Sequence, residues 1–527
     1  MSSNLPLSIF LLLLSIPFSK SQYHFQSPSR ATYIDCGSTV DTIENGRLWE
    51  PDTPYISSGT PKTLALSINV TSPILATVRS FPLQNYVNRK FCYVFPVFRT
   101  GRYLLRTIYY YGGVNAGRNV PPVFDQVVDG TVWGLVNTTD DYAGGNASYY
   151  EGVFAATGNS MSVCVAPNSL TDSDPFISAI EFVMLDRSVY NTTDFNTSGL
   201  RLVARNSFGY NGSIIRFPDD PFDRFWAPFA SGNLTTASST SVSTSGFWNL
   251  PPSKIFETSM AQSQPTLLEF QWPSVSLSNS IYYIALYFAD GRDTLSSSGG
   301  SRVFSVKIND FLFYDNLSLT RDGSAVFSTR WPLDGFTKIS LTPTTDSVSG
   351  PLINGGEVFE VFNLSRKTHT GDVIALETMK SVLQGLPLDW SGDPCMPSQY
   401  AWTGITCFEG NRIRVASLNL TGMGISGSLS PMIARLTALT DLWLGDNILS
   451  GPIPDLSSLR RLQRLHLENN QFSGEIPRSL VNISTLTEVF LQNNNLTGEV
   501  PYGLERPGLT LKLTPGNNFS SPPPPPI

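Results

Sequence analysis

The chain of 527 residues has few of the side chains on which most catalytic and metal sites depend. It contains three histidines, His24, His369 and His466, and five cysteines, none of them spaced as Cys-X-X-Cys. Closely paired cysteines or histidines are typical of zinc sites. A nucleophilic serine or cysteine needs a base within reach, and no Gly-X-Ser-X-Gly sequence accompanies the histidines. We therefore expect no metal site, and a protein that is not an enzyme.

Charge and long apolar runs are also scarce. Asp, Glu, Lys and Arg make up 15% of the chain and its net charge is −7, which offers no basic footprint for nucleic acid or an anionic membrane. The apolar run 5–16 is shorter than the roughly 20 residues that span a bilayer. Small polar residues follow it, as in a secretory signal. We expect cleavage of residues 1–21, no transmembrane segment, and a secreted protein of the extracellular space or cell wall. A membrane anchor is the alternative.

Aromatic residues, glycine and proline are abundant instead. The chain is 12% aromatic and has 41 Gly and 38 Pro, which favours turn-rich β domains. Asn-X-Ser/Thr sequences, the acceptors of N-linked glycans, are frequent and fit an extracellular surface. They begin at Asn69, Asn137, Asn146, Asn191, Asn196, Asn211, Asn233, Asn316, Asn363, Asn419, Asn482, Asn495 and Asn518.

Five cysteines in an oxidising compartment leave one without a partner. Cys395 and Cys407 are close in sequence, and Cys92 and Cys164 each lie in a strand-like run. We therefore expect disulfides between Cys395 and Cys407 and between Cys92 and Cys164, with Cys36 left over. A zinc site is the competing interpretation.

A repeat of about 24 residues dominates the C-terminal part of the chain. Clear copies occupy 439–454, 462–477 and 486–501, and a degenerate copy begins at Val415. Their leucines need a shared core, and an asparagine in each copy can cap the backbone after a short strand. The pattern predicts a short right-handed α/β leucine-rich-repeat solenoid of about four coils over 412–510.

Two further features lie around this repeat. Residues 370–386 have helical periodicity, which places Val373, Leu376, Met379, Val382 and Leu383 on one face. This helix can cover the open end of the solenoid, in a cap over 365–411. The glycines at 422, 424 and 427 match a dinucleotide-binding spacing, but no βαβ unit surrounds them. We assign them to a solenoid turn and expect no cofactor.

A longer repeat organises the rest of the chain. The segment 48–51 recurs at 225–228, and 123–130 recurs at 303–310, with a nearly constant offset. Both copies consist of short alternating or aromatic-rich runs broken by turn residues. This predicts two tandem all-β sandwiches, at 22–192 and 193–364.

Several segments resemble a known family. Tyr33-Ile-Asp-Cys-Gly37, Arg79-Ser-Phe-Pro82, Phe91-Cys-Tyr93 and Pro175-Phe-Ile-Ser-Ala-Ile-Glu181 resemble plant malectin-like domains, and residues 389–407 resemble the cap that precedes plant leucine-rich repeats. The combination is similar to the ectodomain of malectin-like, leucine-rich-repeat receptor kinases. The resemblance implies a secreted receptor-like protein that binds an extracellular peptide or oligosaccharide, with a membrane receptor kinase as an expected partner.

The repeats also indicate where a ligand could bind. The residue between two strand leucines points out of the concave sheet, which stacks Asn419, Trp443, His466 and Phe490. A ladder of rings with a polar rim is typical of protein recognition, although such positions also tolerate any residue. The neighbouring candidates on this face are Asp441, Arg464 and Glu488, with Asp446, Glu468 and Gln492 beside them.

Other interpretations stay open. Tyr109 and Tyr111 alternate along one strand and could stack on a sugar, and the cleft between the sandwiches is an equally good peptide site in the family. A structural wall protein, held by the Pro-rich tail 511–527, is the main alternative function. A hydrolase with two carboxylates is a further one, drawing on the Asp-rich stretches 172–174 and 219–223, although turn residues are favoured there.

Overall fold

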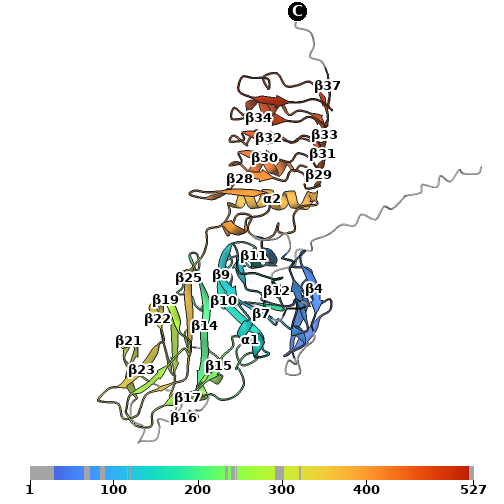
Figure 1. The fold of residues 1–527 in the computed structure, drawn as a ribbon. Coiled ribbons are helices and arrows are strands. Elements are labelled where there is room, and N and C mark those ends of the chain that lie inside the picture. Colours follow the sequence, from blue (N-terminus) through green and yellow to red (C-terminus); the bar gives the residue numbers. More distant parts are fainter. Residues whose placement is uncertain are drawn as a thin grey trace, which may run out of the picture.

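The computed structural model describes residues 29–520, apart from 65–71, 84–88, 116, 119, 232–234, 239–241, 243, 245, 291–301 and 320–321. The predicted signal segment, His24, Asn69, Asn233 and the end of the Pro-rich tail lie outside the described residues. A broad β body comes first, and a stack of coils rises from one end of it (Figure 1).

One mixed sheet runs through the whole β body. Its strands, in spatial order, are β2 (Thr42–Glu44), β3 (Arg47–Pro51), β1 (Ala31–Asp35), β13 (Ala179–Met184), β7 (Arg102–Tyr109), β10 (Ser148–Ala155), β14 (Ser198–Phe208), β25 (Gly355–Asn363), β19 (Leu277–Phe288) and β22 (Ser324–Gly335), with β15 (Ala227–Phe229) beside β14. The two halves join where β10 pairs with β14, with Val153 opposite Leu200. The two predicted sandwiches therefore share a single sheet.

Smaller sheets complete each half. The first half has β6 (Phe91–Pro96), β11 (Ser160–Pro167), β8 (Phe124–Val128) and β9 (Thr131–Val136), and also β12 (Phe176–Ile177), β5 (Thr77–Ser80) and β4 (Thr60–Thr63). The second half has β18 (Leu268–Gln271), β23 (Lys338–Pro343), β20 (Val303–Ile308) and β21 (Phe311–Ser318), and also β16 (Thr235–Ser238), β17 (Thr258–Ala261) and β24 (Leu352–Ile353). The order β6-β11-β8-β9 recurs as β18-β23-β20-β21, so the strand orders of the two halves match.

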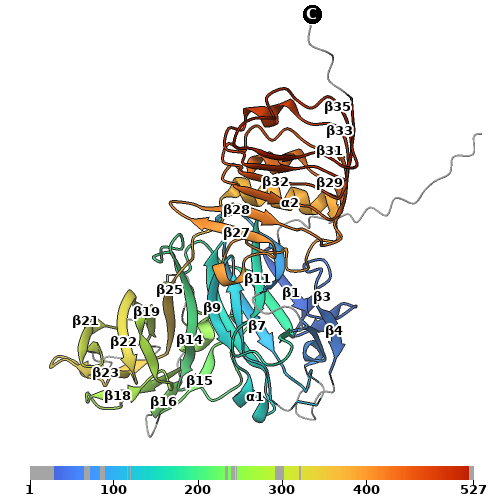
Figure 2. The same cartoon turned by 45° about the horizontal axis from the view of Figure 1, so that its top comes forward.

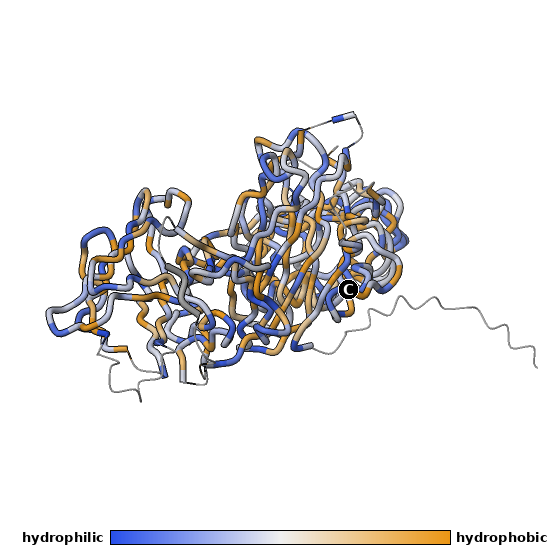
Figure 3. The backbone as a smooth tube through the Cα atoms, turned by 90° about the horizontal axis from the view of Figure 1, so that it is seen from below, coloured by the Kyte–Doolittle hydropathy of each residue, from blue (hydrophilic) through white to orange (hydrophobic). Residues whose placement is uncertain are grey.

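Alternation along β7 decides how the first half packs. Tyr103 and Leu105 point into a core against β6, β8 and β11, whereas Leu104 points to the opposite face. That opposite face meets strands of the second half in a core that includes Tyr283 and Phe359. Figure 3 shows apolar segments running along the strands of the body, with hydrophilic segments in the outer loops.

The short helical elements lie outside these sheets. They are α1 (Thr139–Ala143), α2 (Thr370–Val382), and the 3-10 turns η1 (Pro73–Leu75), η2 (Ser253–Phe256), η3 (Ser398–Tyr400), η4 (Pro431–Arg435) and η5 (Arg478–Asn482). The helix α2 covers the end of the solenoid core, as expected, and buries Ala375, Leu376 and Met379. The predicted apolar face was wrong at Val382, which is 42% exposed because the helix ends there.

The solenoid has a sheet on each of two faces (Figure 2). One consists of β27 (Ile405–Glu409), β28 (Ile413–Asn419), β30 (Asp441–Trp443), β32 (Arg464–His466), β34 (Glu488–Phe490) and β36 (Thr510–Lys512). The other consists of β26 (Leu383–Gln384), β29 (Ser426–Ser428), β31 (Ile448–Pro452), β33 (Gln471–Glu475), β35 (Asn495–Gly498) and β37 (Asn518–Phe519). The expected α-helices are thus replaced by a second sheet and short 3-10 turns.

The glycine and proline of each copy account for this difference. Gly451, Gly474 and Gly498 have φ near +79° and lie in or at the end of the second-sheet strands. Left-handed glycine followed by proline interrupts an α-helix, because proline lacks the N–H that the helix ladder uses. The chain therefore extends along the second sheet instead.

Asparagine side chains hold neighbouring coils together. Asn494 Nδ2 donates to the carbonyls of Leu467 and Leu491, at 2.9 and 3.0 Å, and its Oδ1 accepts from Phe472 N at 2.9 Å. The predicted asparagines Asn447 and Asn470 make the same contacts. Asn517 makes equivalent contacts in a further coil, which the repeat pattern in the sequence did not predict.

Candidate functional site

The first-sheet face of the solenoid carries the candidate site. From β28 to β36 its strands are parallel and in register, so Trp443, His466 and Phe490 lie directly beside one another in successive coils. We call these three residues the aromatic column. Asn419 precedes them at one end and Lys512 follows at the other. The structure therefore brings together the ring positions that the repeat predicted.

The rings of the aromatic column form a continuous stack. The centroids of Trp443 and His466 are 6.0 Å apart, and those of His466 and Phe490 are 4.2 Å apart with only 19° between the ring planes. Lys512 Nζ lies 4.2 Å from the centre of the Phe490 ring. All three rings are only partly buried. An apolar strip about three strands wide thus faces outward.

A charged column runs alongside the rings. Arg464 donates from Nε to Asp441 and lies 5.2 Å over the Trp443 ring, and His466 Nε2 lies 2.9 Å from a carboxylate oxygen of Glu488. Burial tends to raise the pKa of Asp441, but hydrogen bonds from Arg464 and Thr440 outweigh it, so that pKa lies below its ordinary value. These pairs hold the rings in one orientation, and the His466 side chain remains 19% exposed.

Three polar atoms on the same face are shielded from water and have no hydrogen-bond partner among the described residues. They are Trp443 Nε1, Glu468 Oε2 and Gln492 Oε1. Asp446 N donates to Glu468 O and Asn469 N to Gln492 O, both at 3.0 Å, which places Glu468 and Gln492 in adjacent coils. A shielded polar group without a partner costs about 1–3 kcal/mol.

The glycan-acceptor sequences avoid this face except at its first coil. All eleven that fall within the described residues have an exposed asparagine. In the solenoid, Asn482 lies in η5, and Asn495 and Asn518 lie in the second sheet. Asn419 alone is on the first sheet, at the coil nearest the β body. The aromatic column itself carries no acceptor.

The predicted sugar-stacking tyrosines do not fit that role. Tyr109 and Tyr111 are each 1% exposed. Tyr109 packs edge-on against Phe124 and Phe176, and its hydroxyl lies 3.0 Å from Gln126 Oε1. Packing against the smaller sheets covers both rings, so neither offers a face to a sugar in this conformation.

Both expected disulfides form. Cys92 and Cys164 link β6 to β11, where they lie directly opposite each other. Cys395 and Cys407 link the cap to β27. Cys36 is unpaired and fully buried, and burial raises its pKa well above the ordinary value.

A buried charge network joins the two halves of the β body, and no local pattern in the sequence pointed to it. Arg205 contacts Glu151 and Glu357, each at 2.8 Å. Arg106 pairs with Glu151 and Glu181, and its guanidinium lies 3.4 Å over the ring of Phe225. Because residues from both halves meet in it, the network sets their relative position.

The Asp-rich stretches belong to structural ion pairs. Asp220 accepts from Arg224 and from Trp226 Nε1, both at 2.8 Å, and Asp223 accepts from Arg216. Asp172 pairs with Arg118 on the surface. Carboxylates engaged in this way are poorly placed for a hydrolase pair.

The described part of the chain contains no cluster of three or more side chains that could bind a metal. None of the helices in the described ranges has the length and hydropathy to span a bilayer.

Comparison with known proteins agrees with this architecture. Residues 34–361 match the malectin-like domain family, and residues 461–483 match the leucine-rich repeat. A probable LRR receptor-like serine/threonine-protein kinase of Arabidopsis thaliana is 30% identical over 89% of this chain and 51% of its own length. A putative leucine-rich repeat receptor-like kinase of the same plant is also 30% identical, over 82% of this chain and 46% of its own. The chain spans about half the length of these relatives, and the kinases are matched in their extracellular part.

Solved structures share the fold of the β body. The ANX2 ectodomain from Arabidopsis thaliana has a TM-score of 0.53 at 16% identity and covers 63% of this chain and 97% of its own. A structure of the plant peptide RALF23 in complex with FER and LLG2 has a TM-score of 0.52 at 19% identity, covering 64% of this chain and 96% of that one. With a continuous β body of this topology and a family match over most of it, the chain belongs to the malectin-like domain family, in the receptor-like form that carries leucine-rich repeats.

Proposed function

We propose that this protein is a secreted, N-glycosylated recognition protein whose solenoid face binds an extracellular peptide or a partner receptor. The observation that carries the proposal is the aromatic column, Trp443, His466 and Phe490, which stays partly exposed on a rigid sheet. Large rings at the centre of a contact supply much of the binding energy in protein interfaces. The sequence also suggested that the malectin-like body binds an oligosaccharide through Tyr109 and Tyr111. Both side chains are buried and do not support that role.

Two features favour a macromolecular ligand over a small one. The column extends over several coils, and the charged column gives it a polar rim. An extended peptide can contact several successive coils at once. The absence of glycan acceptors on the column keeps this face accessible.

The relatives suggest the setting. They are named as receptor-like kinases, and one structural neighbour was solved with a peptide and a further protein. Without assuming the same ligand, we propose that this chain acts in the extracellular space of a plant, alongside a membrane receptor kinase.

The test is a binding screen with the purified glycosylated protein. Synthetic secreted peptides and purified receptor-kinase ectodomains are immobilised, and binding of wild type is compared with that of Trp443→Ala and Phe490→Ala. For a bound ligand we expect each substitution to weaken affinity at least about tenfold, since truncation of a central ring costs about 2 kcal/mol or more. Phe311→Ala removes a ring that is 71% exposed on the β body and serves as the matched control. A ligand whose affinity is unchanged by both column substitutions would show that it binds elsewhere.

A further inference from the structure

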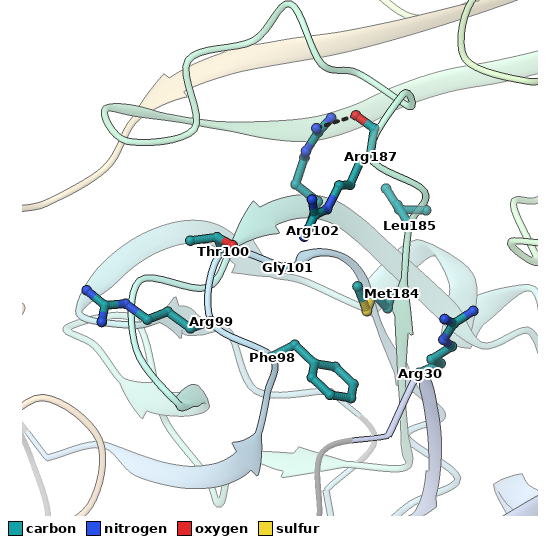
Figure 4. Close-up of a pocket in the computed structure, with 9 residues that line it drawn as sticks. All are labelled: Arg30, Phe98, Arg99, Thr100, Gly101, Arg102, Met184, Leu185 and Arg187. Atoms are coloured by element: carbon teal, nitrogen blue, oxygen red, sulfur yellow. Dashed lines mark hydrogen bonds between the residues drawn. The ribbon is translucent and has the colours of Figure 1, made fainter.

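A cavity lies at one end of the first half of the β body, away from the aromatic column. Its volume is about 320 Å³. The ends of three neighbouring strands of the large sheet frame it, because Arg30 precedes β1, Arg102 begins β7 and Met184 ends β13. The turn 98–101 and the segment 185–187 close its sides (Figure 4).

Four arginines surround this cavity. In Figure 4, Arg30 and Arg99 lie at opposite ends, with Arg102 and Arg187 on a third side. No carboxylate is among the lining residues. We call Arg30, Arg99, Arg102 and Arg187 the arginine pocket. In a chain with net charge −7, four positive charges gathered in one hollow form a local field opposite to that of the whole molecule.

Only one of these guanidiniums has a partner in the described part of the chain. Arg102 donates to the backbone carbonyls of Val189 and Arg187, which fixes its side chain. Arg30, Arg99 and Arg187 are exposed and have no carboxylate within 4.0 Å among the described residues. The nearby Asp186 is held by Ser188, at 2.8 Å from its N–H and 2.7 Å from its hydroxyl. Arg102 and Arg187 also help to lower the pKa of Asp186, so Asp186 gives Arg187 a partial countercharge, whereas the described residues show no such carboxylate for Arg30 or Arg99.

The floor of the cavity is apolar. Phe98, which is 43% exposed, lies beside Met184 and the buried Leu185. The turn that presents Phe98 is rigid, because Phe98 N donates to Tyr103 Oη and Gly101 N donates to Phe98 O, both at 2.8 Å. A rigid apolar floor below a ring of guanidiniums suits a ligand that combines an apolar group with anionic ones.

We propose that the arginine pocket binds an acidic peptide segment, with an apolar side chain on the floor and flanking carboxylates on Arg30, Arg99 and Arg187. Guanidinium groups pair with carboxylates through two parallel hydrogen bonds, which gives both strength and orientation. An amino-acid side chain fits the Phe98, Met184 and Leu185 floor better than a sugar ring, whose edges carry hydroxyls that this floor cannot satisfy. The site does not depend on the proposed role of the aromatic column.

A larger cavity lies at the same end of the body, on the side toward the solenoid, and such a segment could extend into it. Its volume is about 620 Å³, and its lining includes Arg366, Lys367 and Arg412. The two cavities adjoin, because Ala155 in the lining of the larger one pairs with Arg102, and Thr100 N donates to Ala156 O at 2.9 Å. Lys367 is paired with Asp129, which also lines this cavity, so it is Arg366 and Arg412 that extend the positive charge along this end of the molecule, as a peptide with several acidic residues would require.

The test uses the full secreted chain and a labelled synthetic peptide, acetyl-Glu-Leu-Glu-Leu-Glu-amide, with binding followed by fluorescence anisotropy. Arg30→Gln, Arg99→Gln and Arg187→Gln are combined in one variant. We expect it to weaken binding by about tenfold or more, the sum of three partly screened charge pairs, and we expect wild-type affinity to fall as salt is raised. These side chains are exposed, so the melting temperature should not change.

Two comparisons decide the outcome. A variant with Arg435→Gln, Arg460→Gln and Arg461→Gln removes the same charge from exposed positions on the solenoid and should bind within about twofold of wild type. The peptide with Gln in place of Glu should not bind. Equal losses in the two triple variants, or equal binding of the neutral peptide, would overturn the proposal. So would binding of an oligogalacturonide but not of the acidic peptide.

Discussion

The ammonium group of Lys90 donates to the backbone carbonyl of Tyr400, across 310 residues of sequence. Lys90 is fully buried between the first half of the β body and the solenoid cap. Tyr400 in turn donates its hydroxyl to Asp125 at 2.8 Å, and Ser391 Oγ accepts from Cys92 N at 3.2 Å. These contacts join the solenoid cap to the body at one defined junction.

Lys90 makes the stability of this junction depend on pH. Burial lowers its pKa from 10.5 to about 8, although Asp393 and Asp389 oppose the change. The charged lysine is therefore disfavoured in the fold, by about 3 kcal/mol below pH 8, and this cost is relieved as pH rises from 8 to 10.5. Between pH 7 and 9 we expect the free energy of unfolding to rise by on the order of 1 kcal/mol more in wild type than in Lys90→Met, measured by urea denaturation. Equal changes in both proteins would contradict this interpretation.

Gly392 is a second requirement of the junction. It has a φ of +69°, and a Cβ atom there would lie 2.7 Å from Cys92 Sγ. Gly422 has nearly the same φ, +68°, but open space around it. Both Ala substitutions carry a left-handed backbone cost of about 1–2 kcal/mol, so only Gly392→Ala should add a clash of about 1–3 kcal/mol. Urea unfolding of the two variants measures the difference. Equal losses in the free energy of unfolding would mean that the junction rearranges to accommodate the added methyl group.

The asparagine ladder of the solenoid gives a prediction independent of the junction. Asn494→Ala removes hydrogen bonds to Leu467, Leu491 and Phe472. The buried Phe472 N–H is left without its acceptor, whereas the two carbonyls keep hydrogen bonds from Asn470 and Asn517. We expect a loss of about 2–4 kcal/mol in the free energy of unfolding. Gln471→Ala changes an exposed residue in a neighbouring coil and should cost less than about 0.5 kcal/mol. Hydrogen exchange at Phe472 N should speed up only in the first variant.

Glu357 is the central carboxylate of the buried charge network. It accepts from Arg205 Nε at 2.8 Å and from the hydroxyls of Tyr190 and Tyr287 at 2.5 and 2.6 Å. Glu357→Gln leaves Arg205 without its full countercharge in a site closed to water, so we expect a loss of about 3–5 kcal/mol. Glu360→Gln, three residues along the same strand at the partly exposed pair with Arg201, should cost about 1 kcal/mol or less.

The pKa of Glu357 leads us to expect that the stability of the fold is sensitive to acid. Burial tends to raise the pKa of Glu357, but Arg205 and Arg224 outweigh it, so that pKa lies below its ordinary value of 4.5. The stability it contributes is therefore present above pH 4.5 and is lost as pH falls below that value. Thermal melts between pH 3 and 6 should show a steeper fall for wild type than for Glu357→Gln.

Sequence reasoning succeeded where the evidence is local and periodic. The repeat spacing placed Trp443, His466 and Phe490 beside one another and identified the capping role of the asparagines, because each coil meets its neighbour at a constant offset. It failed at the α/β character of the coils and at Tyr109 and Tyr111. Alternation says which residues share a face of a strand, but not whether another sheet covers that face.

The sequence alone determined the order of the parts and the ladder of rings, since these follow from spacing within or between repeats. Both disulfides were predicted on other grounds: Cys395 and Cys407 are close in sequence, and Cys92 and Cys164 lie in strand-like runs. Only the tertiary structure decided that the two halves share one sheet, that Lys90 reaches Tyr400, and that four arginines from three separate segments meet around one cavity. Such contacts join residues far apart along the chain, and they arise from how whole sheets pack, which no local pattern records.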